Sequence, residues 1–239
     1  MTMAPALSLD GVAKSFTMHL QGAVTLPVVR DVSIHVKPSE CVVLGGPSGI
    51  GKSSILKMIY GNYRCNAGRI RIRDDATSID IASAEPQHIV WLRKHKIGYV
   101  SQFLRVIPRV PALDIVAAAA REAGSDASMA RRQATEMLAR LNVPERLWPL
   151  APGTFSGGEQ QRVNIARGFI GRHSVLLLDE PTASLDMGNR AVVVDLIREK
   201  KAAGVALLGI FHDRAVRDQV ADRIVDVAAF ATTASGADR

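Results

Sequence analysis

One short segment constrains the fold of this 239-residue chain more than any other. Residues Gly46–Ser53 match the pattern G-x-x-x-x-G-K-[ST]. They follow the apolar run Cys41–Leu44, which is typical of a strand buried on both faces, and they precede Ser53–Tyr60, whose apolar residues have helical spacing. Glycines let such a loop fold tightly, so that its backbone N–H groups and the positive end of the helix face an anion. The sequence therefore predicts a strand, a phosphate-binding loop and a helix in succession.

The residues of this loop are the first candidates for nucleotide binding. They are Gly46, Pro47, Ser48, Gly49, Ile50, Gly51, Lys52, Ser53 and Ser54. We expect Lys52 to reach the β- and γ-phosphates and the Ser53 hydroxyl to ligate Mg²⁺. The alternative, a plain glycine turn before a helix, is disfavoured because strand and helix stand where the motif requires them.

A second strand ends in two carboxylates. The run Val175–Leu178 is apolar and is followed by Asp179 and Glu180. Open α/β sheets bind ligands at the carboxyl ends of their strands, where Asp179 would hold Mg²⁺ through its water shell. Glu180 is the candidate general base for an attacking water. The alternative is a strand that ends in solvated acids, and the phosphate loop upstream favours the functional interpretation.

A second glycine-rich loop, Phe155–Gln160, precedes an amphipathic helix at Glu159–Phe169. It offers backbone donors at a helix N-terminus, which is a second anion site in one chain. Because one nucleotide does not need two such sites, the second is expected to serve a nucleotide bound by another subunit. The alternative is an ordinary N-cap at Ser156.

The rest of the chain predicts an α/β fold. Short strands are expected over Leu7–Val36, and strands and helices alternate after Phe155, as in a parallel sheet covered on both faces. Between them, about 103–155 is alanine-rich, helical and punctuated by prolines, which indicates an inserted helical lobe. We expect one domain over 1–230 and a disordered tail over 231–239.

Composition excludes several classes of protein. Apolar residues make up 47% and charged residues 22%, which excludes a disordered or collagen-like chain. The longest apolar run, Val205–Phe211, is too short to span a bilayer, and Met1–Asp10 does not resemble a secretory signal, so a cytoplasmic protein without membrane insertion is expected. Cys41 and Cys65 lack metal-ligand spacing and are interpreted as core thiols.

The charge of the chain does not indicate which kind of partner it binds. The net charge is +7, yet no block of five or six consecutive basic residues occurs. Aromatic residues make up only 5%, which weighs against stacking on single-stranded nucleic acid. No nucleic-acid partner is therefore expected.

Taken together, the motifs resemble the nucleotide-binding domain of ATP-binding-cassette (ABC) proteins. In chain order they are Gly46–Ser53, Gln102, Phe155–Gln160, Asp179 with Glu180, Ser184 to Asp186, and His212. The resemblance implies a P-loop NTPase with a RecA-like core, an N-terminal antiparallel β subdomain and an inserted helical subdomain. It also implies a head-to-tail dimer that holds two ATP molecules, each between the phosphate loop of one subunit and the signature loop of the other.

The resemblance also assigns roles to single residues. It implies a catalytic set of Lys52, Gln102, Glu180 and His212, and a Mg²⁺ set of Ser53, Gln102 and Asp179. The signature residues Ser156, Gly157, Gly158 and Glu159 would bind the nucleotide of the opposite subunit, with Ser156 and Gly158 at its γ-phosphate. Phe16 would stack on adenine and Asp186 would lie at the dimer interface. The alternatives are a core aromatic for Phe16 and a structural histidine for His212.

Three longer runs resemble one branch, the PhnL family of the bacterial phosphonate carbon–phosphorus (C–P) lyase system. The runs are Tyr60–Tyr63, Ser101–Arg109, and Leu141–Trp148 running on to Phe155–Ile170. This resemblance implies a cytoplasmic ATPase that acts on the lyase core, either as a homodimer or with a PhnK-like subunit. It further implies a supporting role in the synthesis of ribose 1-methylphosphonate 5-triphosphate.

Two other functions remain open. The first is the energising ATPase subunit of an ABC transporter of the lipoprotein-release type. The second is a scaffold that binds nucleotide without turnover, against which Lys52, Asp179, Glu180 and His212 argue.

Overall fold

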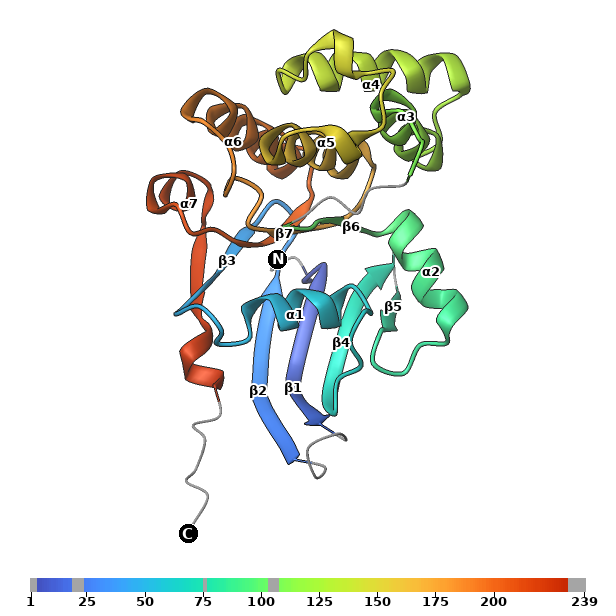
Figure 1. Ribbon diagram of the computed structural model, residues 1–239. Coiled ribbons are helices and arrows are strands. Elements are labelled where there is room, and N and C mark those ends of the chain that lie inside the picture. The colour runs from blue at the N-terminus through green and yellow to red at the C-terminus, as the bar shows by residue number, and fades with distance from the viewer. Residues whose placement is uncertain (1–3, 19–23, 75–76, 103–107, 232–239) are drawn as a thin grey trace.

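The computed structural model describes residues 4–18, 24–74, 77–102 and 108–231. Its elements form three layers, with a helical layer on one side, a parallel sheet in the middle, and helix α1 with an antiparallel sheet on the other side (Figure 1). This arrangement confirms the predicted α/β fold class with its antiparallel β subdomain.

The central sheet is parallel, with strand order β6-β7-β8-β3-β9. Its strands are β3 (Cys41–Gly45), β6 (Ile97–Val100), β7 (Val175–Asp179), β8 (Ala206–Ile210) and β9 (Arg223–Asp226). Every residue of β7 and β8 is buried, as expected for parallel strands covered on both faces. The carboxyl ends of β3, β6, β7 and β8 therefore meet at one edge of the sheet.

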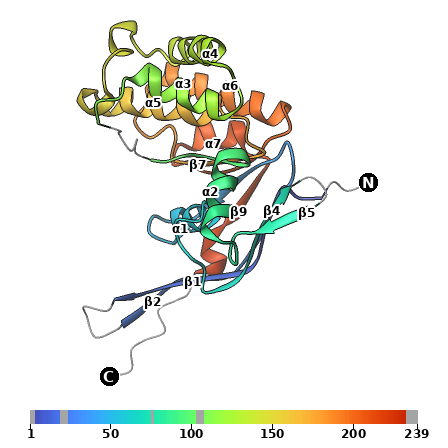
Figure 2. The same ribbon diagram turned by 90° about the vertical axis from the view of Figure 1, so that its right-hand side faces the viewer.

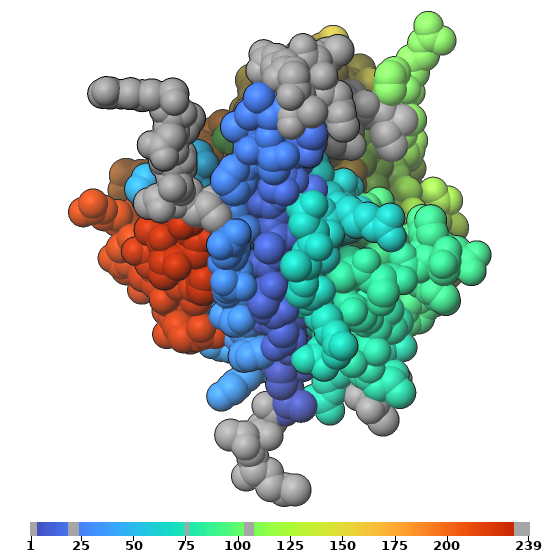
Figure 3. Space-filling model, turned by 90° about the horizontal axis from the view of Figure 1, so that it is seen from below, coloured from blue at the N-terminus to red at the C-terminus, as the bar shows by residue number. Residues whose placement is uncertain are grey.

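The second sheet is antiparallel, with strand order β2-β1-β4-β5. Its strands are β1 (Leu7–Met18), β2 (Val24–Val36), β4 (Ala67–Asp74) and β5 (Thr77–Asp80). The expectation of several short strands over Leu7–Val36 is wrong, because β1 and β2 pair along most of their lengths with register shifts that interrupt the polar alternation. Figure 3 shows β2, β1 and β4 side by side on the face of this sheet that lies away from α1.

Seven α-helices lie within the described ranges, and two views place them (Figures 1 and 2). They are α1 (Lys52–Ile59), α2 (Pro86–His95), α3 (Ala112–Glu122), α4 (Ala127–Arg140), α5 (Gly157–Ile170), α6 (Met187–Ala202) and α7 (Arg214–Val220). Short 3₁₀ turns occur at Glu145–Leu147, Pro152–Thr154 and Val227–Phe230. Helix α1 lies between the two sheets, whereas α5, α6 and α7 lie on the opposite face of the parallel sheet.

Between β6 and α5 the chain forms α3 and α4, which pack on each other and on α5. Both helices lie within about 103–155, where the sequence predicts a helical lobe. Residues 103–107, where the helical lobe was expected to begin, and 232–239 of the expected tail lie outside the described residues.

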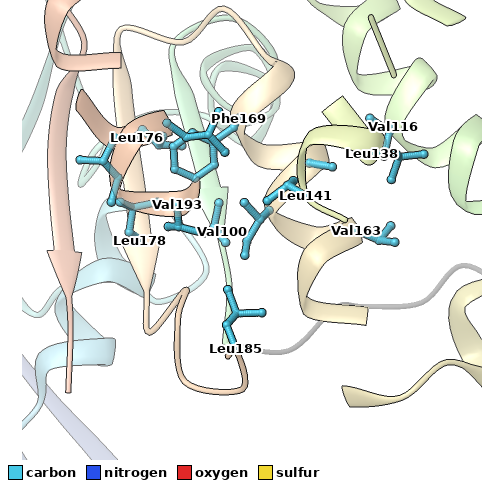
Figure 4. Packing of buried hydrophobic residues seen from close by; sticks show 14 of the residues in the cluster. Val100, Val116, Leu138, Leu141, Val163, Phe169, Leu176, Leu178, Leu185 and Val193 are labelled. Atoms are coloured by element: carbon cyan, nitrogen blue, oxygen red, sulfur yellow. The ribbon is translucent and has the colours of Figure 1, made fainter. Parts of the chain in front are cut away.

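The core consists of two hydrophobic clusters on opposite faces of the parallel sheet. Leu176 and Leu178 of β7 point toward the helical layer (Figure 4), whereas Val175 and Leu177 pack toward α1 and the antiparallel sheet. Burying each such side chain contributes about 1.5–3 kcal/mol, so β7 is anchored from both sides. The strand that ends at Asp179 is thus held firmly in register.

The remaining sequence expectations concern cysteines and membranes. Cys41 is fully buried, and burial raises the pKa of its thiol to about 12, whereas Cys65 is half-buried. Within the described ranges, no helix combines the length and the apolar character needed to cross a bilayer.

Candidate functional site

The phosphate loop takes a shape that requires glycine. Gly46, Gly49 and Gly51 have φ angles of 112°, 80° and 105°, which L side chains rarely adopt. A Cβ atom on Gly51 would also lie 2.8 Å from a methyl group of Val29. The loop leads directly into α1, whose first residue is Lys52, so the N–H groups of its first turn face the space above the loop.

Lys52 lies folded across its own loop. Its Nζ donates hydrogen bonds to the carbonyl oxygens of Gly46, at 2.8 Å, and Pro47, at 2.7 Å. The side chain is buried, and within the described residues its charged Nζ has only these two carbonyl oxygens as hydrogen-bond partners. An arriving phosphate would give this ammonium a stronger, fully charged partner.

A pocket of about 310 Å³ joins this loop to the ends of β7 and β8. Its lining residues are Val28, Ser48, Gly49, Gly51, Lys52, Ser53, Ser54, Glu180 and His212. The pocket therefore brings the loop motif together with two residues that lie more than a hundred positions away in the sequence.

Ser53, which lines this pocket, also belongs to a cluster of oxygen atoms suited to a hydrated divalent cation. Ser53 Oγ donates to Asp179 Oδ1 at 3.0 Å, and the hydroxyl of Tyr99 donates to Asp179 Oδ2 at 2.9 Å. Asp179 is only 3% exposed. One hydroxyl and one carboxylate beside a phosphate pocket fit Mg²⁺, which keeps several waters and takes its other ligands from phosphate oxygens.

Tyr99 is a residue that the sequence analysis missed. It lies on β6, opposite Leu177 of the neighbouring β7, so the parallel register brings its hydroxyl to the carboxylate that ends β7. In the sequence, its position three residues before Gln102 does not by itself indicate a role.

Glu180 is held by two polar side chains from two different strand ends. Gln102 Nε2 donates to Glu180 Oε2 at 3.1 Å, and His212 Nε2 lies 2.7 Å from Glu180 Oε1. The residue itself has a φ of 53°, which is strained for a side chain other than glycine, and such strain is concentrated at functional sites. The structure therefore brings Gln102, Glu180 and His212 together beside the phosphate pocket.

The second glycine-rich loop forms a capping box at the start of α5. Glu159 N donates to Ser156 Oγ at 3.3 Å, while Ser156 N donates to Glu159 Oε2 at 2.8 Å. The hydroxyl and backbone bonds from Ser156 lower the pKa of the Glu159 carboxyl. Among the described residues, the lining of the phosphate pocket does not include the signature residues Ser156, Gly157, Gly158 and Glu159.

Phe16 also lies outside this pocket. Its ring packs edge-on against Tyr63 with centroids 5.2 Å apart, and Lys14 Nζ lies 4.6 Å from its centre. With 36% of its surface exposed, Phe16 belongs to neither core cluster.

Asp186 caps α6, where Asn189 N donates to its Oδ1 at 2.8 Å. The bonds from Asn189 lower the pKa of the Asp186 carboxyl. Arg190, which sequence reasoning did not single out, donates to the Leu185 carbonyl at 2.9 Å and to Asp213 Oδ2 at 2.6 Å. It thus ties the segment beside Asp186 to the loop that carries His212.

Comparisons with known proteins agree with this geometry. Residues 29–183 match the family model described as ABC transporter. The ATP-binding protein LolD of the lipoprotein-releasing system of Maricaulis maris is 37% identical over 223 residues, which are 93% of each chain. The macrolide export ATP-binding/permease protein MacB of Sodalis glossinidius is 32% identical, and this chain spans 33% of its length.

A solved structure matches over nearly the whole chain. It is the dimeric post-hydrolysis state of the ATP-binding cassette MJ0796 bound to ADP and Pi. The TM-score is 0.81 and the sequence identity 26%, over 92% of this chain and 94% of that one.

Proposed function

The chain belongs to the ABC transporter family of ATP-binding proteins, and on that premise we propose that it hydrolyses ATP as one of two cassettes that close on two MgATP. The observation that carries the proposal is the position of Glu180. Its carboxylate lies beside the phosphate loop and is oriented from both sides by Gln102 and His212.

Each residue has a proposed part in the reaction. The loop amides and Lys52 bind the β- and γ-phosphates, while Ser53 and Asp179, whose side chains are hydrogen-bonded to each other, would hold Mg²⁺. The ion, when bound, would neutralise negative charge on the phosphates. A water molecule attacks the γ-phosphorus, the bond to the ADP oxygen breaks, and Glu180 accepts the water's proton. Positioning and charge neutralisation supply most of the rate enhancement.

The other proposed contacts concern the second cassette and the base. Gln102 orients the attacking water and joins the Mg²⁺ shell, and His212 contacts the γ-phosphate. The signature residues Ser156 to Glu159 bind the nucleotide held by the other subunit, which is supported by their position away from this chain's own phosphate pocket. We propose Phe16 as the adenine contact, since its ring remains partly exposed.

Substitution of the proposed base tests the reaction. Glu180→Gln keeps the shape of the side chain, but an NH2 donor replaces one of its accepting oxygens and the amide cannot take up a proton, so turnover should fall by at least about 100-fold while ATP binding is retained. Phosphate release and ATP-dependent dimer formation by size-exclusion chromatography measure the two effects. Lys52→Ala should lose both binding and turnover. Unchanged phosphate release by the Glu180→Gln variant would contradict the proposed role.

The ATPase could act on one of two kinds of protein complex, and the comparisons favour a membrane transporter. The relatives with printed functions are ATP-binding parts of lipoprotein-releasing and macrolide export systems. In this proposal the cassette would energise transport through an integral membrane partner.

The second candidate is the C–P lyase system, and the three sequence runs favour it. Within the run Leu141–Trp148, the side chains of Leu141, Val143 and Leu147 are buried whereas Glu145 and Arg146 are exposed on the helical lobe. In this proposal the cassette acts on a cytoplasmic lyase core, with ATP turnover supporting ribose 1-methylphosphonate 5-triphosphate synthesis. A relative at 37% identity shows the family and leaves the partner open, because one fold serves many partners.

Copurification separates the two candidates. The tagged Glu180→Gln variant, expressed in the native host with ATP, would be isolated once from detergent-solubilised membranes and once from the soluble fraction. Recovery of an integral membrane protein supports the transporter, and recovery of lyase subunits supports the second candidate. The Lys52→Ala variant is the matched control, because it should not form the ATP-closed dimer.

A further inference from the structure

An asparagine stands in the middle of a buried stretch of helix α5. Asn164 has 0% of its surface exposed, and its neighbours Val163, Ile165 and Ala166 are also fully buried. Its Nδ2 donates a hydrogen bond to the backbone carbonyl oxygen of Ser101 at 2.6 Å. Its Oδ1 has no hydrogen-bond partner within the part of the chain that the structure describes.

Such an amide does not favour folding. A buried polar group without its full set of hydrogen bonds costs on the order of 1–3 kcal/mol, whereas an apolar side chain of similar size would pack here without that cost. Packing therefore does not explain why Asn164 occupies this position. Its one hydrogen bond is the specific feature that an apolar residue would lack.

The carbonyl that accepts this bond lies next to Gln102, a residue of the proposed hydrolytic site. Ser101 directly precedes Gln102, whose Nε2 donates to Glu180 Oε2 at 3.1 Å. The backbone carbonyl that Asn164 holds thus belongs to the peptide unit that leads into Gln102. The helix that carries Asn164 begins at the capping box of Ser156, in the signature loop.

We propose that Asn164 is a positioning residue that fixes the backbone at Ser101 and thereby aligns Gln102 with Glu180. Through this bond, a displacement of α5 by a nucleotide at the signature loop reaches the hydrolytic site of the same subunit. The inference rests on the proposed ATP hydrolysis and adds to it a route from the signature helix to Gln102.

The test is a double-mutant cycle on ATP hydrolysis. Asn164→Ala should lower kcat about tenfold, because a small displacement of a positioning group costs one to two orders of magnitude, and should leave KM for ATP within about twofold. Alanine leaves the Ser101 carbonyl without this donor and is smaller than asparagine, so the melting temperature should fall by only a few degrees. Because Asn164 acts through Gln102, the Asn164→Ala/Gln102→Ala variant should have the kcat of Gln102→Ala. Losses that multiply, or an unchanged kcat in Asn164→Ala, would overturn the proposal.

Two controls keep the result interpretable. Gln133→Ala removes a side-chain amide on helix α4 that accepts a hydrogen bond from Ser125 Oγ at 2.8 Å. This contact does not involve Gln102 or Glu180, so kcat should stay unchanged. Hydrogen exchange of the peptide that contains residues 99–102 is measured without ATP, and Asn164→Ala should accelerate it several-fold. Unchanged exchange would overturn the proposal even in a protein without turnover, whereas accelerated exchange with an inactive wild type would refute the proposed hydrolysis and leave the tether supported.

Discussion

At the scale of single residues, the site is a set of side chains that orient one another before any ligand arrives. Both oxygens of the Asp179 carboxylate accept hydrogen bonds, from Ser53 and from Tyr99. Such preorganisation reduces the reorganisation needed when phosphate and cation bind. The hydroxyl of Tyr99 is thus expected to affect the cation site without touching the nucleotide.

Removing that hydroxyl tests its role. Tyr99→Phe removes one hydrogen bond of about 1 kcal/mol to Asp179, so the Mg²⁺ concentration for half-maximal ATP hydrolysis should rise about fivefold. Turnover at saturating Mg²⁺ should change much less. The matched control is Tyr60→Phe, whose ring packs 5.0 Å from that of Tyr99. Equal Mg²⁺ curves for wild type and Tyr99→Phe would contradict the assignment.

His173 is a residue-scale source of pH dependence. Burial, and next the charge of Lys200, lower the pKa of His173 from 6.5 to about 4. The unfolded chain therefore binds a proton at this position below pH 6.5, whereas the folded chain resists it until about pH 4. The stabilisation is complete above pH 6.5 and is lost as the pH falls toward 4, by about 3 kcal/mol.

The measurement is urea unfolding at several pH values between 4 and 7.5. His173→Asn should flatten the decline in the free energy of unfolding over this interval, because the titrating group is gone. His88→Asn, at an exposed position on α2, should leave the wild-type slope in place. A slope in His173→Asn as steep as in wild type would exclude His173 as its source.

At the scale of elements, the pairing of β1 with β4 depends on one glycine. Gly68 of β4 has a φ of 84°, and a Cβ atom there would lie 2.4 Å from the carbonyl oxygen of Gly11. Gly124, after α3, has a similar φ of 97° but nothing within 4 Å among the described atoms. The two positions separate backbone strain from steric overlap.

Alanine substitution at each position measures the two effects. Gly124→Ala should cost about 1 kcal/mol of unfolding free energy, from the left-handed backbone alone. Gly68→Ala adds a backbone clash and should cost about 3 kcal/mol or more, because the strands must move apart. Urea unfolding provides both values. Equal losses would show that β1 and β4 shift apart without cost.

The elements that could be predicted are those with a strong local pattern. The apolar run of β7 and the capping serine of α5 are visible in the sequence because burial on both faces and helix capping each demand particular residue types. Helix α2 and strand β5 were missed. Only Leu92 of α2 is buried, so the helix carries little apolar periodicity, and β5 has only four residues.

The residues of the candidate site likewise differ in how far the sequence could predict them. The phosphate loop and the acids that end β7 follow from local motifs, whereas Gln102 and His212 were assigned by family resemblance. Tyr99 and Asn164 gave no usable sequence signal, because their contacts arise from the register of β6 against β7 and from the packing of α5 on β6. Such contacts join positions that are far apart in the sequence.

At the scale of the whole molecule, the phosphate pocket and the signature loop do not meet within one chain. The phosphate pocket contains Lys52 and Glu180, and the signature loop at Ser156 lies outside it. We propose that a second cassette completes each site, and the similar MJ0796 cassette was solved as a dimer. If two copies of this chain pair head to tail, each complete site combines parts of both copies.

Complementation between two inactive variants tests this pairing. Lys52→Ala destroys the phosphate loop but keeps the signature loop, whereas Ser156→Arg does the reverse, so each variant by itself should be inactive. In an equal mixture about half of the dimers are mixed, and each mixed dimer has one intact site, so phosphate release should return to about a quarter of the wild-type rate. Activity in either variant alone would contradict shared sites. Two folded variants that stay inactive when mixed would contradict a homodimer and favour pairing with a different cassette, because only a partner of another sequence could then supply the missing half.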